Sequence, residues 1–112
     1  MSAITTHVLD VSRGRPARGV AVLLERVGAP QSTTVGRAST DTDGRVKGFT
    51  PAPTLQAGTY RLTFEVGAYF AAAGVEAFYP RVIVEFDVAD PTQHYHVPVL
   101  LSPFGYSTYR GS

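Results

Sequence analysis

The chain has 112 residues, with 10 lysines and arginines against 9 acidic residues, so its formal net charge is +1. This length favours a single domain that spans residues 1–112, and the balanced charge excludes the basic patch or stripe of a nucleic-acid-binding protein. The chain contains no cysteine, which excludes disulfides and thiolate metal sites.

Apolar and polar residues alternate with a period of two along most of the chain, which is typical of half-buried strands. The clearest runs are residues 20–25, 60–66, 81–88 and 94–101, and shorter candidates lie near residues 6–11, 35–40, 45–49 and 105–109. About eight short strands at regular spacing predict an all-β, antiparallel sandwich.

Turn residues separate these strands. Asp43-Gly44 is the strongest hairpin signal in the chain. The one helical candidate is the alanine-rich segment 68–73, which Gly74 would end. A helix this short must be held by packing rather than by its own propensity.

No membrane-spanning or export signal is visible in the sequence. No apolar run approaches the roughly 20 residues that cross a bilayer, and residues 1–7 lack the basic and apolar regions of a signal peptide. We therefore expect a cytoplasmic protein with no membrane partner.

The strand at residues 94–101 carries two of the three histidines. If residues 95, 97, 99 and 101 face the core, His94 and His96 point to the outer face, beside Pro98 and Leu100. Apolar residues on both faces of a small sandwich indicate that an outer face is covered. We expect the cover to be another subunit, so that His96 lines a cleft at a subunit interface.

Histidine and arginine are the candidates for chemistry in this chain. Histidine exchanges protons near neutral pH, so a water molecule activated by His7 or His96 is the expected nucleophile. Arg45 follows the predicted turn, where a guanidinium group can hold a planar, oxygen-rich ligand at two points. Surface histidines and a solvated arginine are the plainer alternatives. The spacing also permits a metal site, formed by His7, His94 and His96.

Segment 94–112 contains a specific motif. It begins with His94-Tyr95-His96-Val97-Pro98, continues through an apolar run and ends with Ser102-Pro103-Phe104-Gly105-Tyr106-Ser107-Thr108-Tyr109-Arg110-Gly111-Ser112. This motif resembles the C-terminal signature of the 5-hydroxyisourate hydrolases, the transthyretin-like enzymes of urate breakdown. The opening motif and the central turn of that family are matched by Thr6-His7-Val8-Leu9-Asp10 and Thr42-Asp43-Gly44-Arg45. The resemblance extends in order along the whole chain.

The resemblance implies a transthyretin-like (prealbumin-like) sandwich of two four-stranded sheets with one short helix. It implies a homotetramer, a dimer of dimers, with active sites in a channel at the dimer–dimer interface. The implied reaction is the hydrolysis of 5-hydroxyisourate, a cyclic amide, to 2-oxo-4-hydroxy-4-carboxy-5-ureidoimidazoline in purine degradation. No metal and no organic cofactor are implied.

The resemblance also implies which residues form the site. Those expected to bind the substrate are His7, Arg45, His96, Tyr109, Arg110, Gly111 and Ser112. Those expected to take part in catalysis are His7, Arg45, His96 and Ser112, with His94 in a supporting role.

Each of these side chains has an expected task. Arg45 would stabilise negative charge on the attacked carbonyl group, one histidine would accept a proton from water, and the other would protonate the departing ring nitrogen. The order of the two histidines stays open. The ionised α-carboxylate of Ser112 would orient Arg45 or a histidine, so residues added after Ser112 are expected to impair activity.

One alternative function is a transthyretin-like carrier that binds a small aromatic ligand in the tetramer channel. A carrier channel favours apolar and hydroxyl groups over two histidines and an arginine. A metal-dependent hydrolase is the second alternative.

Overall fold

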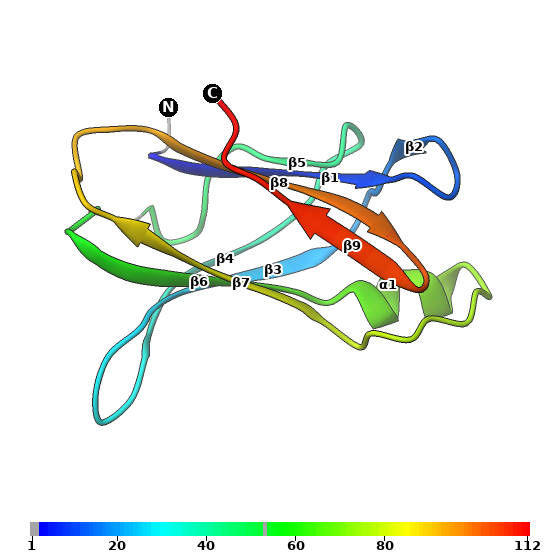
Figure 1. Cartoon of the computed structure of the whole chain (residues 1–112), viewed down its shortest axis with the longest axis horizontal. Coiled ribbons are helices and arrows are strands. Elements are labelled where there is room, and N and C mark those ends of the chain that lie inside the picture. Colours follow the sequence, from blue (N-terminus) through cyan, green and yellow to red (C-terminus); the bar gives the residue numbers. More distant parts are fainter. Residues whose placement is uncertain (1–2, 53) are drawn as a thin grey trace.

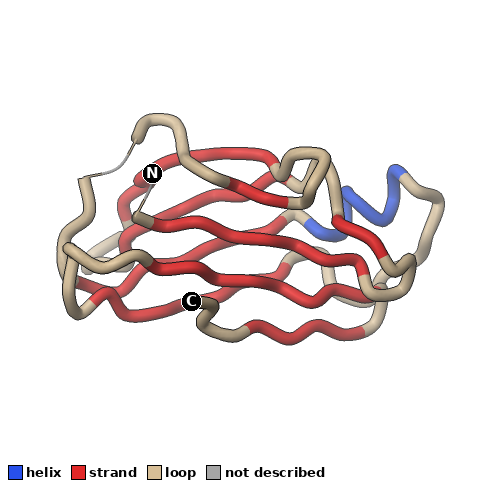
Figure 2. Tube along the Cα trace, turned by 90° about the horizontal axis from the view of Figure 1, so that it is seen from above, coloured by secondary structure: helices blue, strands red, loops and turns tan. Residues whose placement is uncertain are grey.

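The computed structural model describes residues 3–52 and 54–112. The chain forms two β-sheets that pack face to face, with one short helix at one end of the sandwich (Figures 1 and 2). The elements are β1 (Ile4–Asp10), β2 (Arg15–Pro16), β3 (Ala21–Arg26), β4 (Thr33–Ser39), β5 (Arg45–Val46), β6 (Gly58–Phe64), α1 (Val66–Ala72), β7 (Val82–Val88), β8 (Tyr95–Ser102) and β9 (Gly105–Thr108).

The first sheet has the strand order β2-β1-β8-β9, and the two-residue strand β5 also pairs with β1. The predicted transthyretin-like sandwich is confirmed, although this sheet has five strands rather than four. The prediction of a purely antiparallel sandwich is wrong, because β1 and β8 run parallel. Parallel neighbours need a long connection, and here nearly the whole chain separates them.

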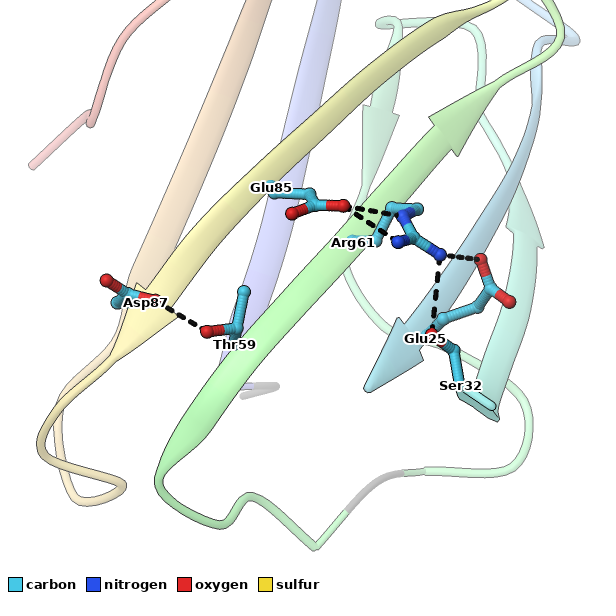
Figure 3. Close-up of polar contacts among 6 residues, drawn as sticks. All are labelled: Glu25, Ser32, Thr59, Arg61, Glu85 and Asp87. Carbon is cyan, nitrogen blue, oxygen red and sulfur yellow. Dashed lines mark hydrogen bonds and ion pairs between the residues drawn. The ribbon is translucent and has the colours of Figure 1, made fainter. Parts of the chain in front are cut away.

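The second sheet is antiparallel, with the order β4-β3-β6-β7. Charged side chains pair across its outer face, as Figure 3 shows. Arg61 on β6 lies 2.8 Å from a carboxylate oxygen of Glu85 and 3.6 Å from one of Glu25. Ion pairs at a solvent-accessible surface contribute little to stability, but these leave the face with compensated charges.

The core lies between the two sheets. The predicted inward face of β8 is confirmed, since Tyr95, Val97, Val99 and Leu101 are at most 6% exposed. From the opposite sheet, Leu24, Leu62 and Phe64 are fully buried. Because alternate side chains of a strand point to opposite faces, this packing turns His94 and His96 away from the core.

The helix α1 begins two residues before the predicted segment. Val66 and Phe70 are one helical turn apart and both are buried against the core, so packing fixes where the helix begins. Gly74 follows the helix with a φ of +70°, as predicted for a terminating glycine. No helix in the described part of the chain is long and apolar enough to cross a membrane.

The segment after Asp43-Gly44 differs from the predicted hairpin. The turn forms, with the Gly44 amide donating to the Asp41 carbonyl over 2.9 Å. The expected strand at residues 45–49 is only two residues long, and it pairs with β1 rather than with the preceding strand. After β5 the chain bends to bury Phe49 in the core, which ends the strand.

Candidate active site

The parallel pairing of β1 with β8 builds the floor of the site from the two ends of the chain. Thr5 lies opposite His96 in the register, and His7 lies opposite Pro98. Thr6 is buried on the core side of β1, so Thr5 and His7 share the outer face with His96.

The turn at residues 41–44 brings Arg45 to the same place. Arg45 pairs with His7 in the register between β5 and β1. The ring nitrogen Nε2 of His7 lies 2.9 Å from the carbonyl oxygen of Asp43. A carbonyl oxygen only accepts hydrogen bonds, so Nε2 of His7 carries a proton and Nδ1 is the free acceptor of the neutral ring.

A cavity of about 430 Å³ opens between these strands. Its walls combine cationic, imidazole and hydroxyl groups, a composition suited to a polar ligand rich in oxygen atoms. The lining residues are Thr5, Thr6, Arg45, Val46, Lys47, His94, His96 and Ser112. The structure therefore brings together Arg45, His96 and Ser112, with His7 beside them on β1.

Gly111 anchors the end of the chain to the site. Its amide donates a hydrogen bond of 2.9 Å to the carbonyl oxygen of His96. A Cβ atom at this position would lie 2.6 Å from Cδ2 of His96 and 3.3 Å from Cγ of Pro98. Only glycine lets the backbone approach the imidazole this closely, and the contact directs Ser112 into the cavity.

Tyr109 and Arg110 lie elsewhere in this chain. They line a second cavity of about 240 Å³, together with core-facing residues such as Tyr95 and Val97. The guanidinium of Arg110 lies 4.6 Å from the centre of the Tyr95 ring, and it donates a hydrogen bond to Gln93 over 3.1 Å. Their predicted contact with substrate stays a prediction.

Burial and neighbouring charges lower the pKa of His96 below its usual 6.5. Burial is the largest cause, followed by the positive charge of Arg45 and the charges of His7 and His94, while a hydrogen bond to the Thr5 backbone acts in the opposite direction. His96 is therefore neutral at pH 7 and can accept a proton.

Arg45 and Lys47 bring positive charge to the cavity. Neither takes part in the salt bridges between described residues, which involve Arg61 and Arg81, although a hydrogen bond from the Arg45 backbone amide and the charges of both side chains help to lower the pKa of the nearby Asp41 carboxyl. An excess of positive charge in a partly enclosed site favours an anionic ligand or a transition state that develops negative charge. Among the described residues, no group of three or more His, Cys, Asp or Glu side chains could hold a metal ion.

The HIUase/Transthyretin family matches residues 4–111 of the chain. The chain belongs to this family. A probable 5-hydroxyisourate hydrolase of Caenorhabditis elegans is 50% identical over 111 residues, which cover 99% of this chain and 82% of the relative. The structure of Klebsiella pneumoniae 5-hydroxyisourate hydrolase is 46% identical, with a TM-score of 0.85 over 97% of this chain and 98% of that one.

The HIUase/Transthyretin family also includes solved structures of transthyretin itself. Transthyretin from Sparus aurata has a TM-score of 0.89 at 29% identity, over 99% of this chain and 97% of that one. The same backbone thus occurs in proteins of this family that carry different names, so the side chains of the site must decide between functions.

Sequence reasoning missed four residues that line the cavity, Thr5, Thr6, Val46 and Lys47. Thr5 and Lys47 could have been found by their spacing, because Thr5 precedes His7 by two positions and Lys47 follows Arg45 by two. Residues two apart on a strand point to the same face. Once one functional residue on a strand is chosen, the residues two positions before and after it are therefore candidates for the same site.

Proposed function

We propose that the chain hydrolyses 5-hydroxyisourate to 2-oxo-4-hydroxy-4-carboxy-5-ureidoimidazoline, a step of purine degradation. The observation that carries this proposal is the cavity that gathers Arg45, His96 and Ser112 next to His7. The names of close relatives that span nearly the whole chain support the same reaction. On this proposal residues 1–112 act as one transthyretin-like hydrolase domain.

Arg45 would bind the substrate and stabilise the transition state. 5-Hydroxyisourate is flat and ringed by carbonyl and N–H groups, which a guanidinium fork can hold at two points. Attack by water on the ring amide places negative charge on the carbonyl oxygen. A fixed cation within hydrogen-bond reach of that oxygen lowers the energy of the tetrahedral intermediate more than that of the substrate.

His96 is the better candidate for the general base. Its lowered pKa keeps it neutral at pH 7, and Nδ1 is occupied by a hydrogen bond to Thr5, so Nε2 is the nitrogen that would take a proton from water. His7 would protonate the departing ring nitrogen. Ser112 lines the same cavity and would help to orient the cationic groups around it.

Self-association as a homotetramer, a dimer of dimers, is part of the same proposal. The outer face of β1 and β8 carries the partly buried Leu9 and Leu100 beside the polar cavity. A second copy placed over this face would exclude water from the apolar side chains and from the reacting groups. The channel formed in this way is also where Tyr109, Arg110 and Gly111 would line a shared site.

A kinetic assay tests the proposed reaction. The ultraviolet absorbance of freshly prepared 5-hydroxyisourate should decay much faster with the protein than without it, and dialysis against a chelator should not change the rate. A decay that matches the protein-free rate would overturn the proposal. Retention of an aromatic ligand without turnover would then favour the carrier, and activity lost on chelation would favour a metal-dependent hydrolase.

The activity should depend on pH through His96. Because its pKa is lowered in the folded chain, the neutral, active form persists below pH 6.5, and kcat/KM should fall only at more acidic pH. The unfolded chain takes up the proton at higher pH than the folded chain does, so the contribution of His96 to stability is present above pH 6.5 and is lost as the pH falls.

The pH profile of kcat/KM and an NMR titration of the His96 ring would both report this pKa. A His96 pKa at or above 6.5 in the free protein would contradict the prediction.

A further inference from the structure

The hydroxyl group of Thr5 lies between the two imidazole rings of β8. Its Oγ1 atom is 2.8 Å from Nδ1 of His96 and 2.9 Å from Nε2 of His94. Thr5 is 9% exposed, whereas His94 is exposed. The hydroxyl group of Thr5 therefore connects the partly buried His96 to a histidine at the surface.

This arrangement links the protonation of the two rings. A threonine hydroxyl has one proton to donate and can accept at its lone pairs. The side-chain hydrogen bonds of Thr5 run to ring nitrogens only, so its proton is directed to one of the two rings and the other ring nitrogen must donate. With both rings neutral, His94 and His96 are held in the same tautomer, with the proton of each ring either on Nδ1 or on Nε2.

The role of His96 selects one of the two arrangements. A general base needs a free lone pair on Nε2, so the proton of the neutral ring must sit on Nδ1. Nδ1 of His96 then donates to Oγ1 of Thr5, and the hydroxyl donates to Nε2 of His94. The opposite arrangement would place the proton on Nε2 of His96 and block the base.

We propose that Thr5 is a positioning residue that holds the His96 proton on Nδ1 and leaves Nε2 free to take a proton from water. This inference rests on the proposed hydrolase function. When water attacks the ring amide, one O–H bond of the water breaks and an N–H bond forms at Nε2 of His96, while Nδ1–H stays bonded to Oγ1 of Thr5. His96 then releases the proton from Nε2 to solvent, which restores the starting tautomer without a change at Thr5 or His94.

The surroundings of His96 favour its neutral form. The groups around it are Arg45 and Lys47 on the β5 side, His7 on β1, His94 on β8 and Ser112. Burial of the ring and the positive charge of Arg45 disfavour an imidazolium ion at His96. The position of the single proton on the neutral ring therefore decides whether Nε2 can act as a base.

Two substitutions test the role of Thr5. Thr5→Val keeps the shape of the side chain and removes the hydroxyl group, whereas Thr5→Ser keeps the hydroxyl group and serves as the matched control. We expect Thr5→Val to lower kcat about tenfold or more with KM changed less than kcat, and Thr5→Ser to stay near wild type.

The NMR spectrum of the ring nitrogens gives a readout that does not depend on turnover. In the wild-type protein above pH 7, His96 should carry its proton on Nδ1 and His94 should accept at Nε2. In Thr5→Val both rings should become mixtures of tautomers. Different tautomers on the two rings of the wild-type protein, or the proton of His96 on Nε2, would overturn the proposal even if Thr5→Val does not fold, and so would full activity of a folded Thr5→Val variant. If the wild-type protein fails to open the substrate ring while both rings carry their proton on Nδ1, the hydrolase proposal fails and the assignment of Thr5 as the residue that fixes the His96 tautomer stands.

Discussion

Arg45→Gln should lower kcat/KM for 5-hydroxyisourate by about 10²- to 10³-fold, because it removes the charged donor that we propose to stabilise the attacked carbonyl oxygen. Arg45 is exposed and lines the cavity, so folding should be nearly unaffected. Glutamine retains hydrogen-bonding capacity but neither the charge nor the two-point fork. The loss should therefore appear in kcat as well as in KM.

The matched control is Arg37→Gln. Arg37 is an exposed arginine on β4, in the opposite sheet, and its replacement should leave turnover unchanged. A second readout follows from electrostatics, since the charge of Arg45 helps to lower the pKa of His96. In Arg45→Gln the NMR titration of His96 should shift to higher pH. Turnover close to wild type in Arg45→Gln would refute the assigned role.

Gly44→Ala should cause the largest loss of stability among single substitutions near the site. Gly44 is buried in the turn before β5 with a φ of +74°, and its carbonyl oxygen accepts a hydrogen bond of 2.7 Å from the Val8 amide. An added Cβ would clash with the Val8 carbonyl oxygen and would lie 2.9 Å from Cβ of Pro16. Backbone must move to relieve that contact, so we expect a loss of more than about 2 kcal/mol.

Gly19→Ala separates the two causes of that loss, which are the left-handed backbone conformation and the steric contact of the added Cβ. Gly19 has a similar φ of +79°, but nothing lies within 4 Å of the Cβ position. Its replacement should therefore cost only the backbone term of about 1 kcal/mol. Thermal or urea unfolding of both variants gives the difference, which measures the steric contact with β1. Equal losses in the two variants would show that the close approach at Gly44 is unimportant.

The sequence predicted the parts of the fold that depend on local pattern. Alternation identified the strands and the inward face of β8, and it put His94 and His96 on the outer face. Gly74 marked the end of the helix because a terminating glycine has a local signature. The same kind of signal identified the turn that precedes Arg45.

Long-range partners could not be predicted from local pattern. The turn at Asp43-Gly44 suggested a hairpin, yet β5 pairs with β1, which is nearly 40 residues away in the chain. Likewise, the direction of the Arg110 side chain depends on the Tyr95 ring and on Gln93. Alternation predicts which face of a strand a side chain takes, but not which strand lies next to it. The contacts of Thr5 with His94 and His96 could not be predicted without that second fact.

The parallel register of β1 and β8 has a consequence for how the protein acquires its activity. The contacts of Thr5 with His94 and His96 span 89 and 91 positions in the chain. Closing a loop of this length costs about 4 kcal/mol of chain entropy beyond a constant, and native contacts of such separation slow folding. Catalytic competence therefore cannot precede the joining of the two chain ends. During refolding, recovered turnover would report the completion of tertiary structure, whereas circular dichroism would also register hairpins such as β8–β9 that form locally.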